Sequence, residues 1–320
     1  MAASTSRPAG SIPVAADAPG RPALRYHGGK WRLTPWTLSH LPAAHDTYVT
    51  GFGGSLSDLL RKARSLIEVA NDLDGDVMTY FRVLRERPEE LIRQIRLTPF
   101  HVGEYRQAQE PTDDPMERAR RFYIRSYMAI AGPTAQANSG WRRQKVFSRG
   151  RDGRKMMTPA AVTFFNVDHL YDVAARLTGV TFEQSPALEL IDRYDNPRTL
   201  FYLDPPYHPE TRSWWATTTY RHEMSHEDHV ELLAAVNRVR GMAAVAGYRC
   251  ALYDEALAHW TRHDKVSRTN GDGSAVESLW VNPAAVAALE QAREREHLSR
   301  RPQLSFFNPD GSTRFRDEEE

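Results

Sequence analysis

The sequence predicts an α/β fold with a mostly parallel β-sheet at its centre. First, short runs rich in β-branched, aromatic and small apolar residues alternate with longer segments of helical periodicity. Second, glycines, prolines or acidic residues directly follow several of these runs, as they do where a strand ends at a loop. Third, 320 residues of which 41% are apolar can bury a substantial core. The runs that predict strands are residues 47–50, 66–70, 180–182, 199–203, 242–246 and 275–281.

Charge and cysteine content limit the classes of protein that fit. The net charge at pH 7 is +1, so any basic surface must be local. The single cysteine, Cys250, excludes an intrachain disulfide framework and a multi-cysteine zinc site, and it is better explained as a small buried residue than as a nucleophile. This composition suits a reducing compartment, and we expect a cytoplasmic protein. No apolar stretch approaches the length of a membrane span, so no membrane partner is expected.

The two ends of the chain differ in composition from the rest. Residues 1–22 are rich in Ala, Pro, Ser and Gly and lack the apolar stretch of a signal peptide, so we expect them to be disordered. Arg7 and Arg21, in a segment with few acids, give a weaker indication of organelle targeting. Residues 301–320 are expected to form a polar C-terminal tail.

The amino-terminal third contains two glycine-rich loops. Leu24 opens a strand-like segment that leads into Gly28-Gly29 and Lys30, with a helix following. The strand at 47–50 ends in a second glycine-rich loop, and this order of strand, loop and helix brings a bound ligand close to backbone amides. Helices are predicted to about residue 41 and over 56–64, 74–86, 117–129 and 283–300.

The middle of the chain departs from the strand–helix alternation. The helix predicted over 117–129 has a basic face, and between Trp141 and Lys155 seven basic residues stand against one acid. Trp141 and Phe147 lie among these charges, a composition typical of a loop that contacts nucleic acid, although a solvated flexible loop also favours basic residues. We therefore divide the ordered chain into residues 23–96, an insertion at 97–166, and residues 167–300.

Asp204-Pro205-Pro206-Tyr207 directly follows the run at 199–203. A β-rich run that stops at two prolines predicts that the tetrapeptide lies at the carboxyl end of a strand, where open α/β sheets bind ligands. The prolines remove two backbone donors, so their carbonyls can point into a cleft between a carboxylate and an aromatic ring. Such a pocket suits a flat base with an exocyclic amine. A strand-ending turn without chemistry is the alternative.

His222-Glu223-Met224-Ser225-His226 has the His-Glu-x-x-His pattern of zinc proteases. That pattern binds metal only when both histidines lie one turn apart on a continuous helix. Ser225 is instead predicted to be an N-cap, with Asp228 completing a capping box. The helix then begins between the two histidines, and no metal site is expected.

Taken in this order, these pieces resemble the Dam-like, alpha-group adenine-N6 DNA methyltransferases, which share the Asp-Pro-Pro-Tyr motif. The resemblance covers most of the chain, from about residue 24 to 283. It implies a Rossmann-like class I methyltransferase sheet of seven strands, closed by an antiparallel pair, with the insertion serving in target recognition. The pieces that support it are residues 26–30, 71–75, 204–207 with Arg212 behind them, and Glu277-Ser278-Leu279-Trp280.

The resemblance implies transfer of a methyl group from S-adenosylmethionine to adenine N6 in double-stranded DNA, with the base flipped out of the duplex. The base would stack on Tyr207, and its amine would donate to the Asp204 carboxylate and the Pro205 carbonyl, with Pro206 completing the catalytic motif. Cytosine N4 is left open as an acceptor. By analogy with relatives, a monomer is slightly favoured.

The resemblance also assigns the cofactor and DNA contacts. Asp72 would accept the ribose hydroxyls, and Lys30 would meet a carboxylate of the cofactor. The implied cofactor residues are Tyr26, His27, Gly28, Lys30, Thr50, Gly51, Phe52, Gly53, Gly54, Ser55, Asp72 and Leu73. The implied DNA contacts are Trp141, Arg142, Arg143, Lys145, Arg149, Arg151 and Arg212.

The sequence departs from the family where an acid and a proline usually end the first strand, because Thr50-Gly51 stands there. Leu56 replaces a later glycine, which is tolerable at the start of a helix. A second acid is missing near Pro186, with Glu183 and Glu189 on either side. In relatives the first acid faces the cationic amino-acid end of S-adenosylmethionine.

Three functions are compatible with this departure. The chain is an ordinary methyltransferase in which His27 or Asp58 compensates, or it uses a modified donor such as a carboxylated S-adenosylmethionine, or it binds DNA without catalysis. The intact Asp204–Tyr207 motif argues against the last. If a carboxylate is missing, Thr50→Glu should raise activity with S-adenosylmethionine.

Overall fold

The computed structural model describes residues 7–130, 132–133, 140–143, 160–212, 220–268 and 274–299. The strands of this part of the chain are β1 Thr47–Thr50, β2 Ile67–Asn71, β3 Thr181–Glu183, β4 Thr199–Leu203, β5 Met242–Gly247, β6 Thr261–Arg268 and β7 Ser274–Val281. The helices are α1 Thr34–Ser39, α2 Ser57–Arg61, α3 Gly75–Glu86, α4 Pro88–Leu97, α5 Val102–Gln107, α6 Pro115–Met128, α7 Ala160–Phe165, α8 His169–Leu177, α9 Ala187–Tyr194, α10 His226–Val236, α11 Ala251–Ala256 and α12 Pro283–Ser299, with a 3₁₀ turn at Pro209–Thr211.

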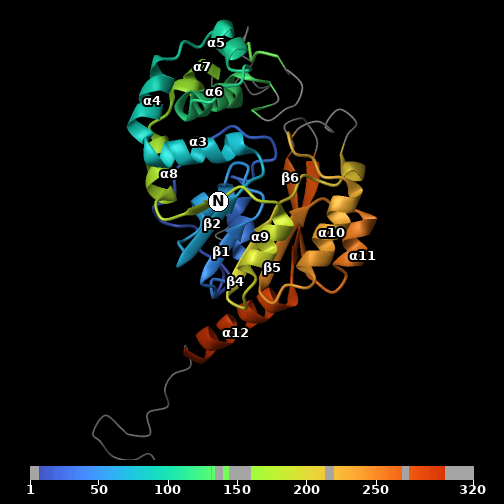
Figure 1. The fold of residues 1–320 in the computed structure, drawn as a ribbon. Helices are drawn as coiled ribbons and strands as arrows, with labels where there is room; N and C mark the ends of the chain where they lie inside the picture. The colour runs from blue at the N-terminus through green and yellow to red at the C-terminus, as the bar shows by residue number, and fades with distance from the viewer. Residues whose placement is uncertain are drawn as a thin grey trace, which may run out of the picture.

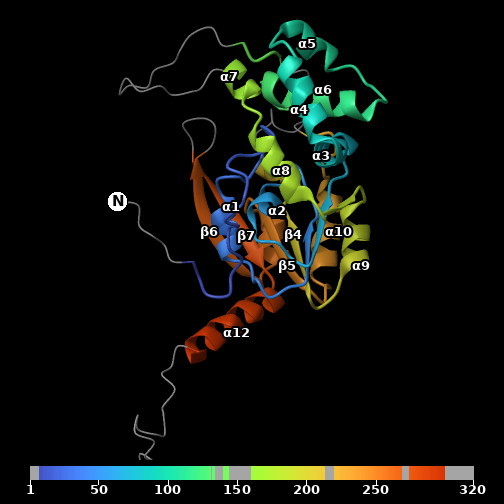
Figure 2. The ribbon, with the colours of Figure 1, turned by 90° about the vertical axis from the view of Figure 1, so that its left-hand side faces the viewer.

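The strands form one seven-stranded sheet in the order β3-β2-β1-β4-β5-β7-β6, with helices on both faces (Figures 1 and 2). Strands β1 to β5 pair in parallel, whereas β7 runs antiparallel to both β5 and β6. This confirms the predicted mostly parallel, Rossmann-like sheet that is closed by an antiparallel pair. It also brings the carboxyl ends of β1, β2, β4 and β5 to one edge.

The two central strands are buried on both faces because helices cover each side. Along β4, Phe201 and Leu203 pack with helices α9, α10 and α11, whereas Leu200 and Tyr202 pack on the opposite face with α1 and α12. Every residue of β4 and β5 is buried. This double cover explains why both strands are continuous apolar runs in the sequence.

Helices α4 to α7 form a layer above the carboxyl edge of the sheet (Figure 1). They share one hydrophobic cluster with α3 and α8, in which Tyr80 of α3 packs against Phe122 and Tyr123 of α6. The region predicted as an insertion therefore has no core separate from its neighbours. The boundaries 97–166 remain a prediction.

The basic face predicted for the helix at 117–129 is largely neutralised within the protein. Arg120 and Arg121 of α6 pair with Glu117 one turn away, at 2.7 Å each. Arg125 and Arg118 pair with Asp76 at the start of α3, the former at 2.8 Å. These pairs join the upper layer to the helix that follows β2.

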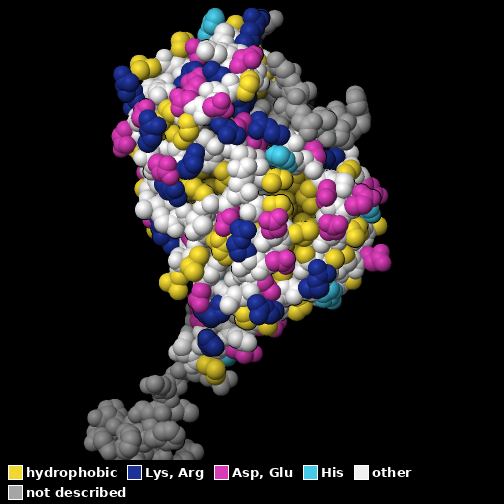
Figure 3. Space-filling view, viewed as in Figure 1, with side chains coloured by type: hydrophobic (Ala, Val, Ile, Leu, Met, Phe, Trp, Pro, Cys, Tyr) yellow, Lys and Arg dark blue, Asp and Glu magenta, His cyan; other side chains and the backbone are white. Residues whose placement is uncertain are grey.

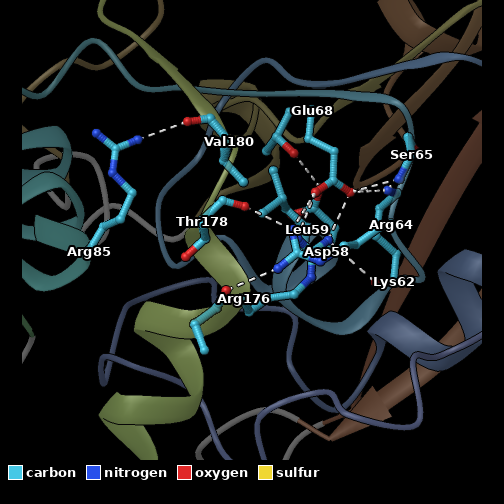
Figure 4. A network of polar contacts seen from close by, with 12 residues as sticks. Asp58, Leu59, Lys62, Arg64, Ser65, Glu68, Arg85, Arg176, Thr178 and Val180 are labelled. Carbon is cyan, nitrogen blue, oxygen red and sulfur yellow. Dashed lines mark hydrogen bonds and ion pairs between the residues drawn. The ribbon is translucent and has the colours of Figure 1, made fainter.

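A buried ion network joins α2, β2 and α8 (Figure 4). The Glu68 carboxylate accepts from Lys62 at 2.5 Å and from the two terminal nitrogens of Arg176 at 2.6 and 2.8 Å. All three side chains are almost fully buried, with exposed fractions of 0% for Lys62, 4% for Glu68 and 2% for Arg176. Burial lowers the pKa of Lys62 to about 8, although Glu68 raises it. Two buried cations thus depend on one carboxylate, which the exposed Arg64 also approaches to 4.0 Å.

The expectation that residues 1–22 are disordered is wrong for the described part, residues 7–22. Ile12 is 3% exposed, and its amide donates to the Leu41 carbonyl at 2.9 Å. Further on, the Ala15 amide donates to the Arg61 backbone carbonyl at 2.8 Å. The few apolar residues of this segment, hidden in a Pro- and Ala-rich composition, are enough to anchor it beside α1 and α2.

The strand-like segment at Leu24 is also not a strand. The amide and carbonyl of Arg25 instead bond to the Ser126 hydroxyl of α6, at 2.8 and 2.9 Å. Among the described residues, no helix is both long enough and apolar enough to cross a membrane.

Candidate active site

A cavity of about 280 Å³ lies at the carboxyl ends of β1, β2 and β4. On the face seen in Figure 3, hydrophobic side chains gather in a hollow between the upper helical layer and the body of the sheet. Most of the predicted cofactor and catalytic residues line the cavity together. They are Tyr26, His27, Gly28, Lys30, Phe52, Gly53, Gly54, Ser55, Asp72, Leu73, Asp204, Pro205, Pro206 and Tyr207.

The glycine-rich loop after β1 is held against the end of β2. The Gly53 amide donates to the Asn71 carbonyl at 2.7 Å, and a Cβ on Gly53 would lie 2.9 Å from that oxygen. Gly54 has a φ of +49° and donates its amide to the Asp72 carboxylate at 2.7 Å. Both positions therefore favour glycine, the first because of this close approach. At Gly54 the backbone is left-handed and a Cβ would also lie 2.9 Å from the Tyr26 ring.

Asp72 follows β2 and faces the cavity with its backbone partners already in place. One carboxylate oxygen accepts from Gly54 and the other from the Asp74 amide at 2.8 Å. Burial raises the pKa of Asp72 to about 6, even though these two amides lower it. Because each carboxylate oxygen has two lone pairs, Asp72 can still accept hydroxyl protons from a ligand.

Thr50 and Gly51, which were predicted to contact the cofactor, are not among the residues that line the cavity. Thr50 is fully buried, and its hydroxyl donates to the Asp58 carboxylate at 2.6 Å. The same carboxylate oxygen accepts from Tyr48 at 3.0 Å, and Asp58 lines the cavity. Burial raises the pKa of Asp58 although both hydroxyls lower it. A carboxylate from the first turn of α2 therefore lies beside the strand end that lacks one.

Leu56 adopts the left-handed conformation that explains why a glycine is common at its position. Its φ is +51°, and it is the N-cap of α2. The side chain is fully buried in the cluster that includes Leu59 and Leu60. The sequence explained this leucine by the start of a helix, but that is only part of the reason. The buried contacts of its side chain also offset the strain of the left-handed backbone.

The end of β3 has no acid at the cavity, in agreement with the gap noted in the sequence. The cavity wall there is formed by Pro186, Ala187 and Leu188. Glu183 lies at the strand end but pairs with Arg193, at 2.8 Å. An apolar wall of this kind suits the face of a flat ring rather than a charged group.

The Asp-Pro-Pro-Tyr motif follows β4, as predicted, and turns into the cavity. Asp204 lies 3.6 Å from the Lys30 ammonium, with its side chain 17% exposed. Burial raises the pKa of Asp204 to about 6; Lys30 lowers it, and the nearby Glu277 carboxylate raises it further. The Tyr207 hydroxyl donates to Glu277 at 2.5 Å. At neutral pH the site therefore presents an ionised acceptor beside an anchored aromatic ring.

Lys30 lies among the groups of this motif. Its ammonium is 3.6 Å from both Asp204 and Glu277, and it also contacts the Tyr207 hydroxyl. Burial alone would lower the pKa of Lys30, but the two carboxylates raise it above its ordinary value. The partner carboxylates of Lys30 thus belong to the protein. Glu277 belongs to one of the segments that support the family resemblance, but the sequence predicted no role for it in the site.

Tyr220 and its neighbours form a cover over the cavity that the sequence did not reveal. The Tyr220 ring stacks on Tyr26 with centroids 6.3 Å apart, and the Arg212 guanidinium lies 5.5 Å from its centroid. Arg212 pairs with Glu223 at 2.6 Å and is 9% exposed. Arg221 reaches Asp74 at 2.8 Å. Arg212, expected to contact DNA, here supports the cover, and its DNA contact remains a prediction.

The other predicted DNA contacts lie on or beyond the edge of the described chain. Trp141 packs against Phe100 with centroids 6.0 Å apart, and the Arg143 guanidinium lies 5.3 Å from the Trp141 centroid. The Arg142 amide donates to the Met128 carbonyl at 2.6 Å. Lys145, Arg149 and Arg151 lie outside the described residues.

The His-Glu-x-x-His pattern is broken by a helix start, as predicted. Ser225 caps α10 in a capping box with Asp228, so that His222 precedes the helix and His226 begins it. His226 instead lies 3.0 Å from a ring nitrogen of His208. In the part of the chain that the structure describes, no group of three His, Cys, Asp or Glu residues is arranged to hold a metal ion.

Comparison with known proteins agrees with this arrangement. No curated protein matches the sequence. Residues 26–247, more than half of the chain, match the family described as D12 class N6 adenine-specific DNA methyltransferase. The matched segment includes both glycine-rich loops, Asp72 and the complete Asp-Pro-Pro-Tyr motif. The chain therefore belongs to the D12 class of adenine-N6-specific DNA methyltransferases.

Proposed function

We propose that the protein transfers the methyl group of S-adenosylmethionine to N6 of an adenine that has been flipped out of double-stranded DNA. The observation that supports this most strongly is the shared cavity. It joins the glycine-rich loop and Asp72 to Asp204 and Tyr207. A donor held at one end and a base held at the other would then be in reach of each other.

The residues at the cofactor end fit S-adenosylmethionine. The Asp58 carboxylate suits its ammonium group, and Asp72 suits the two ribose hydroxyls. The apolar wall at Pro186 and Leu188 suits the adenine ring. Bound S-adenosylmethionine supplies an electrophilic methyl group. We propose that the protein's part is to orient the cofactor through these contacts, with Tyr26 and Tyr220 excluding water above it.

At the base end, the target adenine would stack on Tyr207, and its amine would donate to the Asp204 carboxylate and the Pro205 carbonyl. Two acceptors fix the nitrogen lone pair toward the methyl carbon, and in-line displacement at carbon depends mainly on such positioning. The pKa of Asp204, about 6, leaves it ionised at neutral pH and able to take the proton that the amine releases. Lys30 belongs to this base-binding end, because its carboxylate partners are Asp204 and Glu277.

The geometry around Thr50 favours ordinary S-adenosylmethionine over a carboxylated donor. The missing strand-end acid has a neighbouring substitute in Asp58, 2.6 Å from the Thr50 hydroxyl. Because Asp58 is itself a carboxylate, it would repel a second negative charge on a donor bound there. The described contacts therefore support compensation by Asp58, one of the alternatives that the sequence left open.

Thr50→Glu is now expected to lower activity with S-adenosylmethionine rather than raise it. The new carboxylate would replace a buried hydroxyl at hydrogen-bond distance from Asp58, and crowding alone should cost about 1–3 kcal/mol in unfolding free energy. Urea denaturation and methylation assays on the purified variant measure both effects. Thr50→Val, which replaces the hydroxyl with a methyl group and adds no charge, is the matched control and should cost about 1 kcal/mol. A gain in activity for Thr50→Glu would restore the missing-carboxylate interpretation.

The proposed reaction is tested by mass analysis of nucleosides from DNA incubated with the protein and S-adenosylmethionine. A methyl increment on deoxyadenosine is expected. No increment in that sample, together with a heavier deoxyadenosine in DNA from the expressing host, would indicate another donor. No modified base in either sample would contradict the proposed transfer.

A further inference from the structure

We propose that Glu277 of strand β7 is a positioning residue for methyl transfer: its carboxylate anchors the Tyr207 ring and shares the Lys30 ammonium with Asp204. The inference rests on the proposed roles of Asp204 and Tyr207. It adds a fixed negative charge from an antiparallel strand to a site otherwise built at the ends of parallel strands.

The contacts form a continuous chain from Lys30 to Glu277. The Lys30 ammonium donates to the Tyr207 hydroxyl, which in turn donates to Glu277 at 2.5 Å. Lys30 also lies 4.5 Å from the Tyr207 ring centroid, and Tyr248 packs on the same ring with centroids 4.4 Å apart. A ring held through its hydroxyl and one of its sides has little freedom to tilt away from a stacked base.

The topology explains how a residue so late in the sequence reaches this site. Because β7 is antiparallel to β5, the first half of β7 lies at the same sheet edge as the carboxyl ends of the parallel strands. Ser278 pairs with Gly247, the last residue of β5, and Glu277 is one residue beyond that pair. Glu277 is 9% exposed, so its charge is directed into the protein rather than to solvent.

The carboxylates of Glu277 and Asp204 compete for one buried cation. Lys30 lies 3.6 Å from each of them. The pair of carboxylates exceeds the single ammonium by one negative charge, so Glu277 raises the pKa of Asp204 while Lys30 lowers it. Asp58 of α2 also raises the pKa of Asp204. Asp204 in turn raises the pKa of the tyrosines around it, which are Tyr202, Tyr207, Tyr220, Tyr248 and Tyr253.

Loss of the Glu277 charge is expected to move the acid limb of the activity profile to lower pH. Asp204 must be ionised to accept protons from the amine, so activity falls as the pH drops through its pKa, about 6. Removing the Glu277 charge removes a like charge and leaves Lys30 to Asp204 alone. Both changes lower the pKa of Asp204 and move the acid limb of the activity profile to lower pH.

Glu277→Gln isolates the charge, because a glutamine carbonyl can still accept from Tyr207. For the full chain, we expect the acid limb of kcat to move down by about half a pH unit or more. We also expect kcat at pH 8 to fall about tenfold as Lys30 shifts toward Asp204 and competes with the amine. Glu277→Asp keeps the charge but shortens the reach, so it should lower kcat while leaving the acid limb in place.

A ¹³C titration of the Asp204 carboxyl, assigned with Asp204→Asn, gives the same comparison without turnover. A shift of the Asp204 titration in Glu277→Gln shows that the Glu277 charge acts on Asp204. If the parent protein methylates nothing, this electrostatic part of the inference stands while the proposed function fails. An active parent with an unchanged acid limb and titration in Glu277→Gln would overturn the inference. Parent-like kcat in Glu277→Asp would also overturn it, and this variant decides the matter if Glu277→Gln does not fold.

Discussion

Asp204→Asn is expected to reduce the rate of adenine methylation about 1000-fold. Asparagine has nearly the same shape and keeps one carbonyl acceptor, but it cannot take the proton that the amine releases. It also removes one of the two carboxylates, 3.6 Å from Lys30, that stabilise this buried ammonium. The variant should still bind S-adenosylmethionine, because the cofactor contacts at Asp72 and the glycine-rich loop lie at the other end of the cavity.

Single-turnover methylation and calorimetric titration with S-adenosylmethionine measure these two effects separately. Asp192→Asn is the matched control, since Asp192 is an exposed residue of α9 that does not line the cavity. It should methylate at the rate of the parent. A rate for Asp204→Asn within tenfold of the parent would mean that another group accepts the amine protons.

The strand ends of the site could be predicted from the sequence because the signals are local. The run before Asp204 stops at two prolines, and the chain after β1 and β2 continues with glycines or an aspartate. Ser225 and Asp228, three residues apart, likewise predicted the start of α10 and thereby removed the apparent zinc motif. In each case a few adjacent residues determine the backbone, and the backbone determines where the side chain lies.

Several residues of the site come together through tertiary contacts that the sequence does not specify. Asp58 was one of two candidates to compensate for Thr50, and only the fold shows that its carboxylate accepts from the Thr50 hydroxyl at the cavity. Glu277 is a polar position in a strand and meets Lys30 across almost the whole length of the chain. Tyr220 covers Tyr26 in the same way. No spacing in the sequence connects such pairs.

The segment at 7–22 shows the opposite failure, in which composition concealed a real contact. Its Pro, Ala and Gly content is typical of disorder, but Ile12 fills a place in the core beside Leu38 and Leu41. Ser11 and Pro19 are buried as well. These few buried residues and some backbone hydrogen bonds are enough to hold the segment beside α1 and α2. Average composition does not register so small a set of anchors.

Glu68→Gln is expected to lower the unfolding free energy by about 3–5 kcal/mol at pH 7. The substitution keeps the side-chain shape but leaves Lys62 and Arg176, which are 0% and 2% exposed, without their shared counter-charge. Urea denaturation measures the loss. Glu90→Gln, which removes an exposed partner of Arg87, is the control and should unfold like the parent.

The pH dependence of this loss distinguishes an uncompensated charge from a simple packing defect. The pKa of Lys62 in the folded protein is about 8, below its ordinary 10.5, so the unfolded chain binds the extra proton between these values. Stability contributed by Lys62 therefore increases as the pH rises through that window. Without Glu68 the pKa of Lys62 in the folded protein should fall further, because the carboxylate raises it.

The loss of unfolding free energy in Glu68→Gln should therefore be smaller at pH 9 than at pH 7. At pH 9 Lys62 can lose its proton and leave no unpaired charge, whereas Arg176 stays charged. A deficit independent of pH would mean that lost packing, rather than unpaired charge, destabilises the junction of α2, β2 and α8.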